Sequence, residues 1–115
     1  MKNNRTLPAR PRSPPTRPKT PAAPKHLEPD ERRMWRDITT EFSFDDPASL
    51  ALLRSALEAH QRARRCRLVI DVEGEGVRDR FQQLRAHPLL AAERDARAAF
   101  LSAMRALNLD LGTAI

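Results

Sequence analysis

The sequence has little cysteine, little glycine and no long apolar run, and each shortage excludes a class of protein. A single cysteine, Cys66, excludes an intramolecular disulfide and fits a reducing compartment. No stretch is long and apolar enough to span a membrane, and the basic start lacks the apolar run of a signal peptide. We therefore expect a soluble intracellular protein. Its body of roughly ninety residues can bury only about two-thirds of its surface, so self-association would stabilise it.

Motifs for catalysis and for cofactor binding are also absent. The three histidines have no cysteine or acidic residue at metal-ligand spacing. Gly74 and Gly76 alternate with Glu73 and Glu75, whose carboxylates would repel a phosphate, so this segment does not resemble a nucleotide-binding loop. No serine lies in a nucleophile motif, and neither does the lone cysteine. The sequence thus predicts a protein that is not an enzyme and needs no metal or cofactor.

Proline and positive charge are concentrated in residues 1–25. This segment holds seven of the ten prolines, seven lysines or arginines and no acidic residue, whereas residues 26–115 carry a net charge of −1. Repeated proline blocks helix and strand pairing, so we predict a disordered, extended arm. Such an arm suits the phosphates of nucleic acid, although a leader that merely happens to be basic, or a proline-docking ligand, stays open. The arm residues predicted to contact DNA are Arg10, Arg12, Arg17, Lys19 and Lys25.

The remaining residues, 26–115, are predicted to form one all-α domain that begins with a short helix over residues 29–42. Pro29 suits a first helical position, and acidic residues follow it in the first turn, where the helix dipole favours negative charge. Trp35 lies on the apolar face of this helix, and we interpret it as a core anchor rather than a base-stacking residue.

Two long helices are expected next, over residues 47–72 and 88–108. Small apolar residues recur on one face of each, which indicates close antiparallel packing with Cys66 as a small core residue. A glycine-containing turn joins them, and we expect Phe81, Leu84 and Val77 to pack back from this linker onto the helices. The expected faces are Leu52, Ala56, Ala59, Ala63, Cys66 and Ile70 on one helix and Leu89, Ala92, Ala96, Ala99, Phe100, Ala103 and Leu107 on the other.

Four arginines are concentrated near the end of the second helix. At 100° per residue they point in several directions and form no single stripe. They fit a solvated helix end, where positive charge is favoured, and they also fit contact with nucleic acid. We predict that this cluster is a DNA-binding site, formed by Arg62, Arg64, Arg65 and Arg67.

The layout resembles a family of small terminase subunits of tailed bacteriophages. Members combine a basic, proline-rich leader, a tryptophan-containing helix, a long helix, a glycine-marked turn and a last helix of the form His-Pro…Glu-Arg-Asp-Ala-Arg. The resemblance covers residues 24 to 110, and Gln82 departs from it where a glycine is expected. The matching positions are Leu27, Pro29, Trp35, Gly74, Gly76, Arg80, Phe81, His87, Pro88, Glu93, Arg94, Asp95, Ala96 and Arg97.

The resemblance implies a non-catalytic role in the cytoplasm of a bacterial host. Small terminase subunits bind viral double-stranded DNA, assemble into rings, and recruit and regulate the large ATPase–nuclease subunit. Four apolar residues lie off the predicted packing faces and are therefore our candidates for contacts between subunits: Leu68, Val69, Leu90 and Leu101. A small helical DNA-binding regulator and a protein-interaction adaptor stay open as alternatives, although a regulator needs a short recognition helix after a tight turn.

Overall fold

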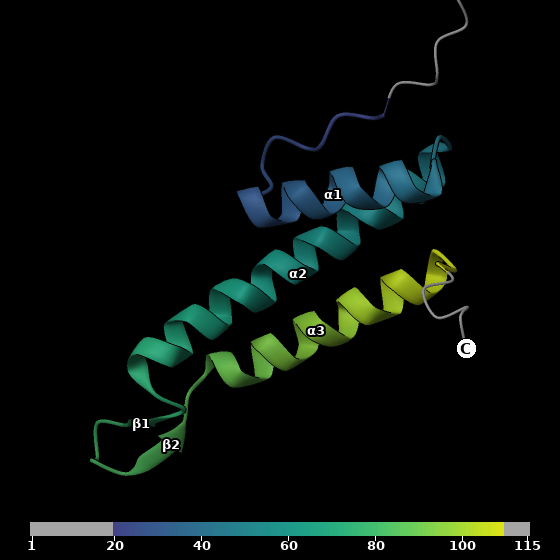
Figure 1. Cartoon of the computed structure of the whole chain (residues 1–115). Coiled ribbons are helices and arrows are strands. Elements are labelled where there is room, and N and C mark those ends of the chain that lie inside the picture. Colours follow the sequence, from purple (N-terminus) through teal and green to yellow (C-terminus); the bar gives the residue numbers. More distant parts are fainter. Residues whose placement is uncertain (1–19, 110–115) are drawn as a thin grey trace, which may run out of the picture.

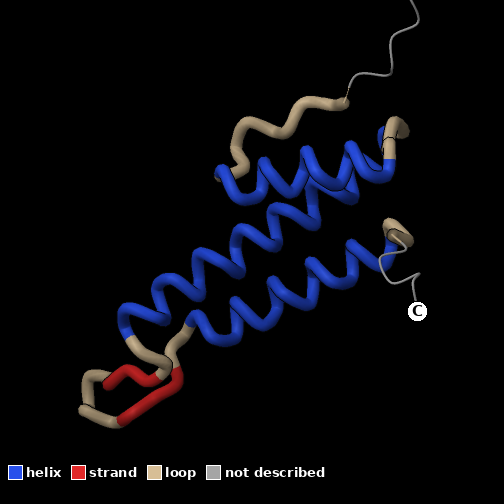
Figure 2. Tube along the Cα trace, viewed as in Figure 1, coloured by secondary structure: helices blue, strands red, loops and turns tan. Residues whose placement is uncertain are grey.

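The computed structural model describes residues 20–109, which form three helices and a two-stranded sheet (Figure 1). Helix α1 spans Pro29–Phe42, α2 spans Pro47–Glu73 and α3 spans Leu89–Ala106. α1 lies along the N-terminal part of α2, and α3 runs back beside α2 in the opposite direction (Figure 2). The prediction of a helical fold with a short helix and two long, antiparallel helices is confirmed. None of the described helices combines the length and apolarity needed to cross a membrane.

Local sequence determines where the helices begin and end. α1 starts at Pro29 and ends at Phe42, and Ser43 caps it with a left-handed backbone conformation (φ 52°). Asp46 caps α2, because its Oδ2 accepts the backbone N–H of Ser49 at 2.9 Å. Gly74 terminates α2 at φ 89°, a conformation that side chains rarely adopt. The predicted ends of α1 and α2 are therefore correct to within one residue.

The α2–α3 interface is built from small side chains. On α2 the predicted seam is buried from Ala56 through Ile70, including Cys66 at 7% exposure. On α3 the matching face is narrower than predicted: Ala96 is buried, whereas Ala99 is exposed to solvent. Alanine seams let two helix backbones approach closely, so modest side chains suffice to exclude water.

The larger apolar residues form a core where α1 crosses α2 and the end of α3. Leu53 and Leu57 have no exposed surface, and Leu27, Trp35 and Leu107 pack with them. Burying each leucine contributes roughly 1.5–3 kcal/mol. This cluster confirms Trp35 as a core residue, and it shows that α1 is held by side chains from two segments distant in sequence.

The connection between α2 and α3 is a β-hairpin, which was not predicted from the sequence. Strand β1 (Gly76–Arg78) pairs antiparallel with β2 (Leu84–Ala86). The expectation that Phe81 and Leu84 pack onto the helices is wrong, since they are 67% and 69% exposed. The cause is local: Asp79 Oδ1 accepts the backbone N–H groups of Phe81 and Gln83, which closes the loop on its own backbone.

Part of the predicted arm packs against the body. The indole N–H of Trp35 donates to the carbonyl of Pro21 at 2.9 Å, and Arg32 donates to the carbonyl of Lys25 at 2.6 Å. Proline-rich backbone has few internal hydrogen bonds, so its carbonyls are available to side-chain donors. Residues 20–25 therefore belong with the folded domain in this structure, whereas Arg10, Arg12, Arg17 and Lys19 lie outside the described residues.

Candidate functional site

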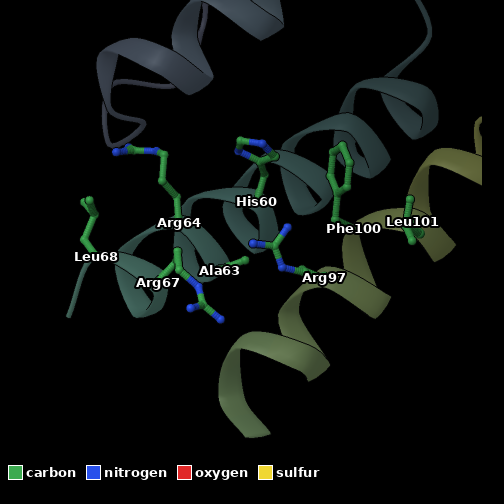
Figure 3. A pocket seen from close by; sticks show the side chains of 8 residues that line it. All are labelled: His60, Ala63, Arg64, Arg67, Leu68, Arg97, Phe100 and Leu101. Atoms are coloured by element: carbon green, nitrogen blue, oxygen red, sulfur yellow. The ribbon is translucent and has the colours of Figure 1, made fainter. Parts of the chain in front are cut away.

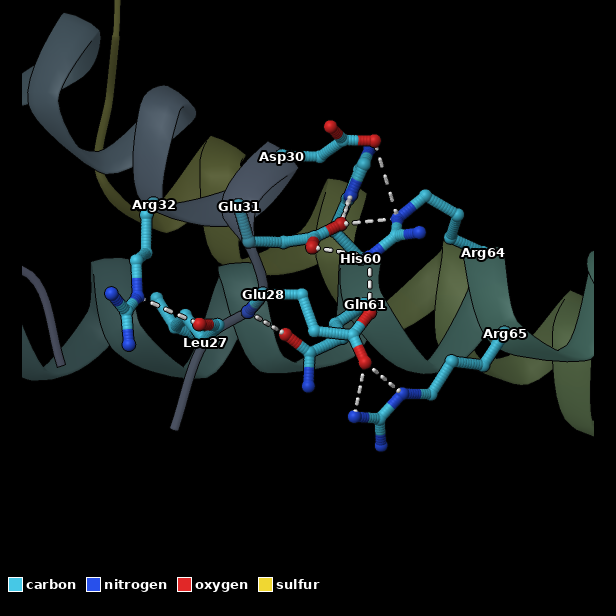
Figure 4. Close-up of polar contacts among 9 residues, drawn as sticks. All are labelled: Leu27, Glu28, Asp30, Glu31, Arg32, His60, Gln61, Arg64 and Arg65. Atoms are coloured by element: carbon cyan, nitrogen blue, oxygen red, sulfur yellow. Dashed lines mark hydrogen bonds and ion pairs between the residues drawn. The ribbon is translucent and has the colours of Figure 1, made fainter. Parts of the chain in front are cut away.

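A buried carboxylate joins α1 to α2. Glu31 has no exposed surface, and Arg64 holds it with two bonds, Nε to Oε2 at 3.0 Å and Nη2 to Oε1 at 2.8 Å (Figure 4). His60 Nδ1 lies 2.7 Å from the same Oε2. Burial opposes ionisation of Glu31, but the bonds from Arg64 and His60 outweigh it and lower the pKa of Glu31 below its ordinary value. The carboxylate is therefore ionised and fully satisfied at neutral pH.

The start of α1 extends this cluster. The backbone N–H of Glu28 donates to Oε1 of Gln61 at 2.7 Å, and the Glu28 carboxylate accepts hydrogen bonds from both Arg64 and Arg65 (Figure 4). The bond from Arg65 contributes most to a lowered pKa of Glu28. Both arginines thus serve to fasten the first turn of α1, where the helix dipole already favours carboxylates.

A second charged clamp joins α2 to α3. Arg67 donates through Nε and Nη2 to the two oxygens of Glu93, at 2.9 and 2.6 Å, and Arg97 donates to Oε2 of Glu93 at 2.7 Å. These bonds, the one from Arg67 foremost, lower the pKa of Glu93 to about 2. Two arginines sharing one carboxylate is a strong, directional arrangement, and it fixes the rotation of α3 against α2.

The structure places the predicted DNA-binding arginines in different environments. Arg64, Arg65 and Arg67 are each paired with a carboxylate within the chain, whereas Arg62 is exposed and contacts no acidic residue among those described. Lys25 is also exposed. DNA contact by these residues stays a prediction, and paired arginines would have to exchange a carboxylate for a phosphate in order to make it.

An open groove of about 400 Å³ lies between α2 and α3 on the side of the Glu31 cluster (Figure 3). It contains two of the four predicted subunit-contact residues, Leu68 and Leu101, which are 55% and 51% exposed. Phe100 lines it, with its ring edge-on to His60 at 5.1 Å between centroids. The groove is lined by His60, Ala63, Arg64, Arg67, Leu68, Arg97, Phe100 and Leu101.

The other two predicted contact residues are distributed differently. Leu90 is half-buried and lies eleven residues before Leu101, which puts both on one side of α3 at 100° per residue. Val69 is 37% exposed and does not line the groove. Leu68 and Leu101 therefore share the groove, whereas neither Leu90 nor Val69 is among its lining residues.

Each histidine contacts a glutamate that is distant in sequence. His87 is buried; its Nδ1 accepts the backbone N–H of Leu89 at 3.0 Å, which places its proton on Nε2, 2.7 Å from Glu73. His87 thereby ties the start of α3 to the end of α2. The paired contacts do not gather further ligands: within residues 20–109, no three histidine, cysteine or acidic side chains are placed to hold a metal ion.

The arginines of the hairpin were not among the residues predicted to bind DNA, although Arg80 is one of the positions that carry the family resemblance. They follow no helical stripe, and the linker that contains them was expected to pack onto the helices. The pairing of two three-residue strands across a five-residue loop is a weak sequence signal.

In comparisons with family models, curated proteins and solved structures, nothing matches this chain.

Proposed function

We propose that this chain is a non-catalytic DNA-packaging subunit of the small-terminase type. It binds viral double-stranded DNA and serves a large subunit that carries the ATPase and nuclease activities. The resemblance over residues 24–110 supports this proposal, and so does a three-helix body that follows the layout the resemblance implies. The observation that carries it is the division of charge along the chain.

Residues 1–25 carry seven positive charges and no negative one, while the body carries a net charge of −1. Within the body, Arg64, Arg65 and Arg67 are held by glutamates. The net positive charge of the chain therefore comes from residues 1–25, which is the arrangement expected of a phosphate-binding tail on a neutral domain.

A salt series tests DNA binding by the arm. The full chain is compared with a full-length variant in which Arg10, Arg12, Arg17 and Lys19 are replaced by glutamine, which retains the Pro21 contact to Trp35. Removing one phosphate contact should flatten the plot of log affinity against log salt by about 0.9, so the four substitutions should flatten it by up to about 3.6. A slope that does not change excludes the arm as the DNA-binding segment, and absence of DNA binding by the full chain refutes the proposed function.

We assign the groove side of α2 and α3 to contacts between copies of this chain. Half-exposed Leu68 and Leu101 form an apolar surface there, and a small core gains from further burial. Leu101→Asp should leave helicity intact and lower the native mass measured by light scattering. Ser102→Asp adds the same charge at the neighbouring exposed position and should not change the mass. Full assembly of the Leu101 variant would refute this placement.

An adaptor function is the second candidate, and the groove is the observation that favours it. A partner protein, rather than a second copy, would then cover Leu68, Phe100 and Leu101. An adaptor predicts negligible DNA affinity at any salt concentration, which the same salt series measures. The regulator alternative is disfavoured, because the helix after the first turn is α2, which spans 27 residues and packs its small side chains against α3.

A further inference from the structure

The hairpin lies at the end of the α2–α3 pair, away from α1 (Figure 1). Residues 76–86 contain three arginines and a single acidic residue, Asp79. The hairpin therefore carries a net charge of +2 on a short ribbon, whereas the arginine cluster of α2 is largely neutralised by glutamates.

Two of the three hairpin arginines have no carboxylate partner among the described residues. Arg78 donates to the backbone carbonyl of Gln82 at 2.8 Å, and the Arg80 guanidinium lies 5.0 Å from the centroid of the Phe81 ring. Arg85 pairs with Asp79 at 2.9 Å, on a side chain that is 63% exposed. Arg78 and Arg80 are thus positioned but not neutralised.

Acidic residues at the base of the hairpin are occupied by other partners. Asp71 and Glu75 lie 3.4 and 3.7 Å from Arg67, and Glu73 lies 2.7 Å from His87. These three carboxylates lie near Arg67 and His87 at the base of the hairpin, and none of them pairs with Arg78, Arg80 or Arg85.

The tip combines this charge with exposed apolar side chains on a preorganised loop. Phe81 and Leu84 are 67% and 69% exposed, beside Arg80 and opposite Arg78 respectively. Asp79 holds the loop through the backbone N–H groups of Phe81 and Gln83. A two-stranded ribbon of this width fits a DNA groove, where arginines reach phosphates and an apolar side chain packs against the sugars and base edges.

We infer that the β1–β2 hairpin is a second contact for double-stranded DNA, with Arg78 and Arg80 at phosphates and Phe81 against the groove. This inference rests on the proposed DNA-binding function and adds to it a site that is independent of the arm. Positive charge without a local carboxylate, next to an exposed aromatic ring, fits a polyanion better than an apolar protein surface.

The test compares full-length chains that bind a labelled DNA duplex over a salt series. Replacing Arg78 and Arg80 by glutamine should flatten the salt slope by about 1.8 and weaken binding about 30-fold at about 0.15 M salt. The matched control replaces Arg94 and Arg105, exposed arginines of α3, and should leave the slope unchanged. Lysine at positions 78 and 80 should restore the slope, because it restores the charge without the guanidinium geometry.

Phe81→Ser should lower affinity about tenfold without changing the slope, because it removes an apolar contact and no charge. A glutamine variant with an unchanged slope overturns the inference, and if neutralising the arm still flattens the slope, the proposed function stands. Absence of DNA binding by the full chain overturns both. A normal slope with a lowered native mass also overturns the inference and identifies the hairpin as a contact between copies.

Discussion

The attachment of α1 depends on one buried carboxylate, and replacing Glu31 by glutamine tests this directly. The substitution keeps the shape of the side chain but replaces one acceptor oxygen with an NH2 donor, which faces the donors of Arg64 or His60. A hydrogen bond to a charged group contributes about 1.5–3 kcal/mol, and breaking a buried ion pair costs about 3–5 kcal/mol. Arg64 keeps its contact with Glu28 and is 27% exposed, so the expected loss is smaller, about 2–3 kcal/mol.

The assay uses the only tryptophan as a reporter. Trp35 lies on α1, is 4% exposed and bonds to Pro21, so its fluorescence reports whether α1 is docked, while far-ultraviolet circular dichroism reports all three helices. For a domain of this size, a loss of about 2–3 kcal/mol lowers the melting temperature by roughly 10–20 °C. We expect the fluorescence transition of the variant to precede the loss of helicity, because the α2–α3 seam does not involve Glu31.

The matched control is Glu41→Gln, the same substitution on the same helix at an exposed position. It should change the melting temperature by no more than about 2 °C. The role assigned to Glu31 is refuted if its variant melts like this control, or if both probes of the Glu31 variant give the wild-type midpoint. In that case the Leu27 and Trp35 contacts alone would hold α1.

Three further predictions concern pH, backbone and packing. The pKa of Glu93 is about 2 in the folded chain, below its ordinary value of 4.5, so its stabilising effect is complete above about pH 4.5 and is lost as the pH falls toward 2. Urea unfolding should show the unfolding free energy falling over this pH range, with a flatter pH dependence for Glu93→Gln. Gln82 has φ 63°, so Gln82→Gly should stabilise by about 0.5–1 kcal/mol while Gln83→Gly destabilises, as midpoints of urea unfolding will show. Ala63→Leu should overpack the seam and cost about 1–3 kcal/mol, whereas Ala99→Leu at an exposed site should change the unfolding free energy by less than about 0.5 kcal/mol.

The helices could be predicted because their signals are local. Pro29, Pro47 and Pro88 each suit a first helical turn, and Pro88 has helical dihedral angles (φ −57°, ψ −28°) directly before α3. The spacing of small apolar residues from Ala56 through Ala63 to Ile70 likewise determines which side of α2 meets α3. Such patterns depend on residues within one or two turns, which are visible in the sequence.

The hairpin could not be predicted in this way, because it depends on hydrogen bonds from one side chain to backbone groups that only a particular loop conformation brings within reach. Asp79 accepts two backbone N–H groups only when Gln82 adopts a left-handed backbone, which glutamine does not signal. The resemblance led us to expect a glycine at position 82, and the observed φ of 63° is the conformation that glycine adopts most readily.

The arginines show why a site is harder to predict than a fold. In the sequence, the cluster at 62–67 and the three arginines at 78–85 are both basic, and DNA binding was predicted for the denser cluster. The two groups differ in their carboxylate partners. Those of the 62–67 cluster lie 26 to 37 residues away in sequence: Glu28 at the N-terminal cap of α1, Glu31 within α1 and Glu93 in α3. An arginine already bonded to a buried carboxylate must give up that bond to reach a phosphate, whereas one that faces only a carbonyl or an aromatic ring gives up much less. Availability of charge, rather than its density along the chain, is therefore the quantity to compare, and it favours the hairpin.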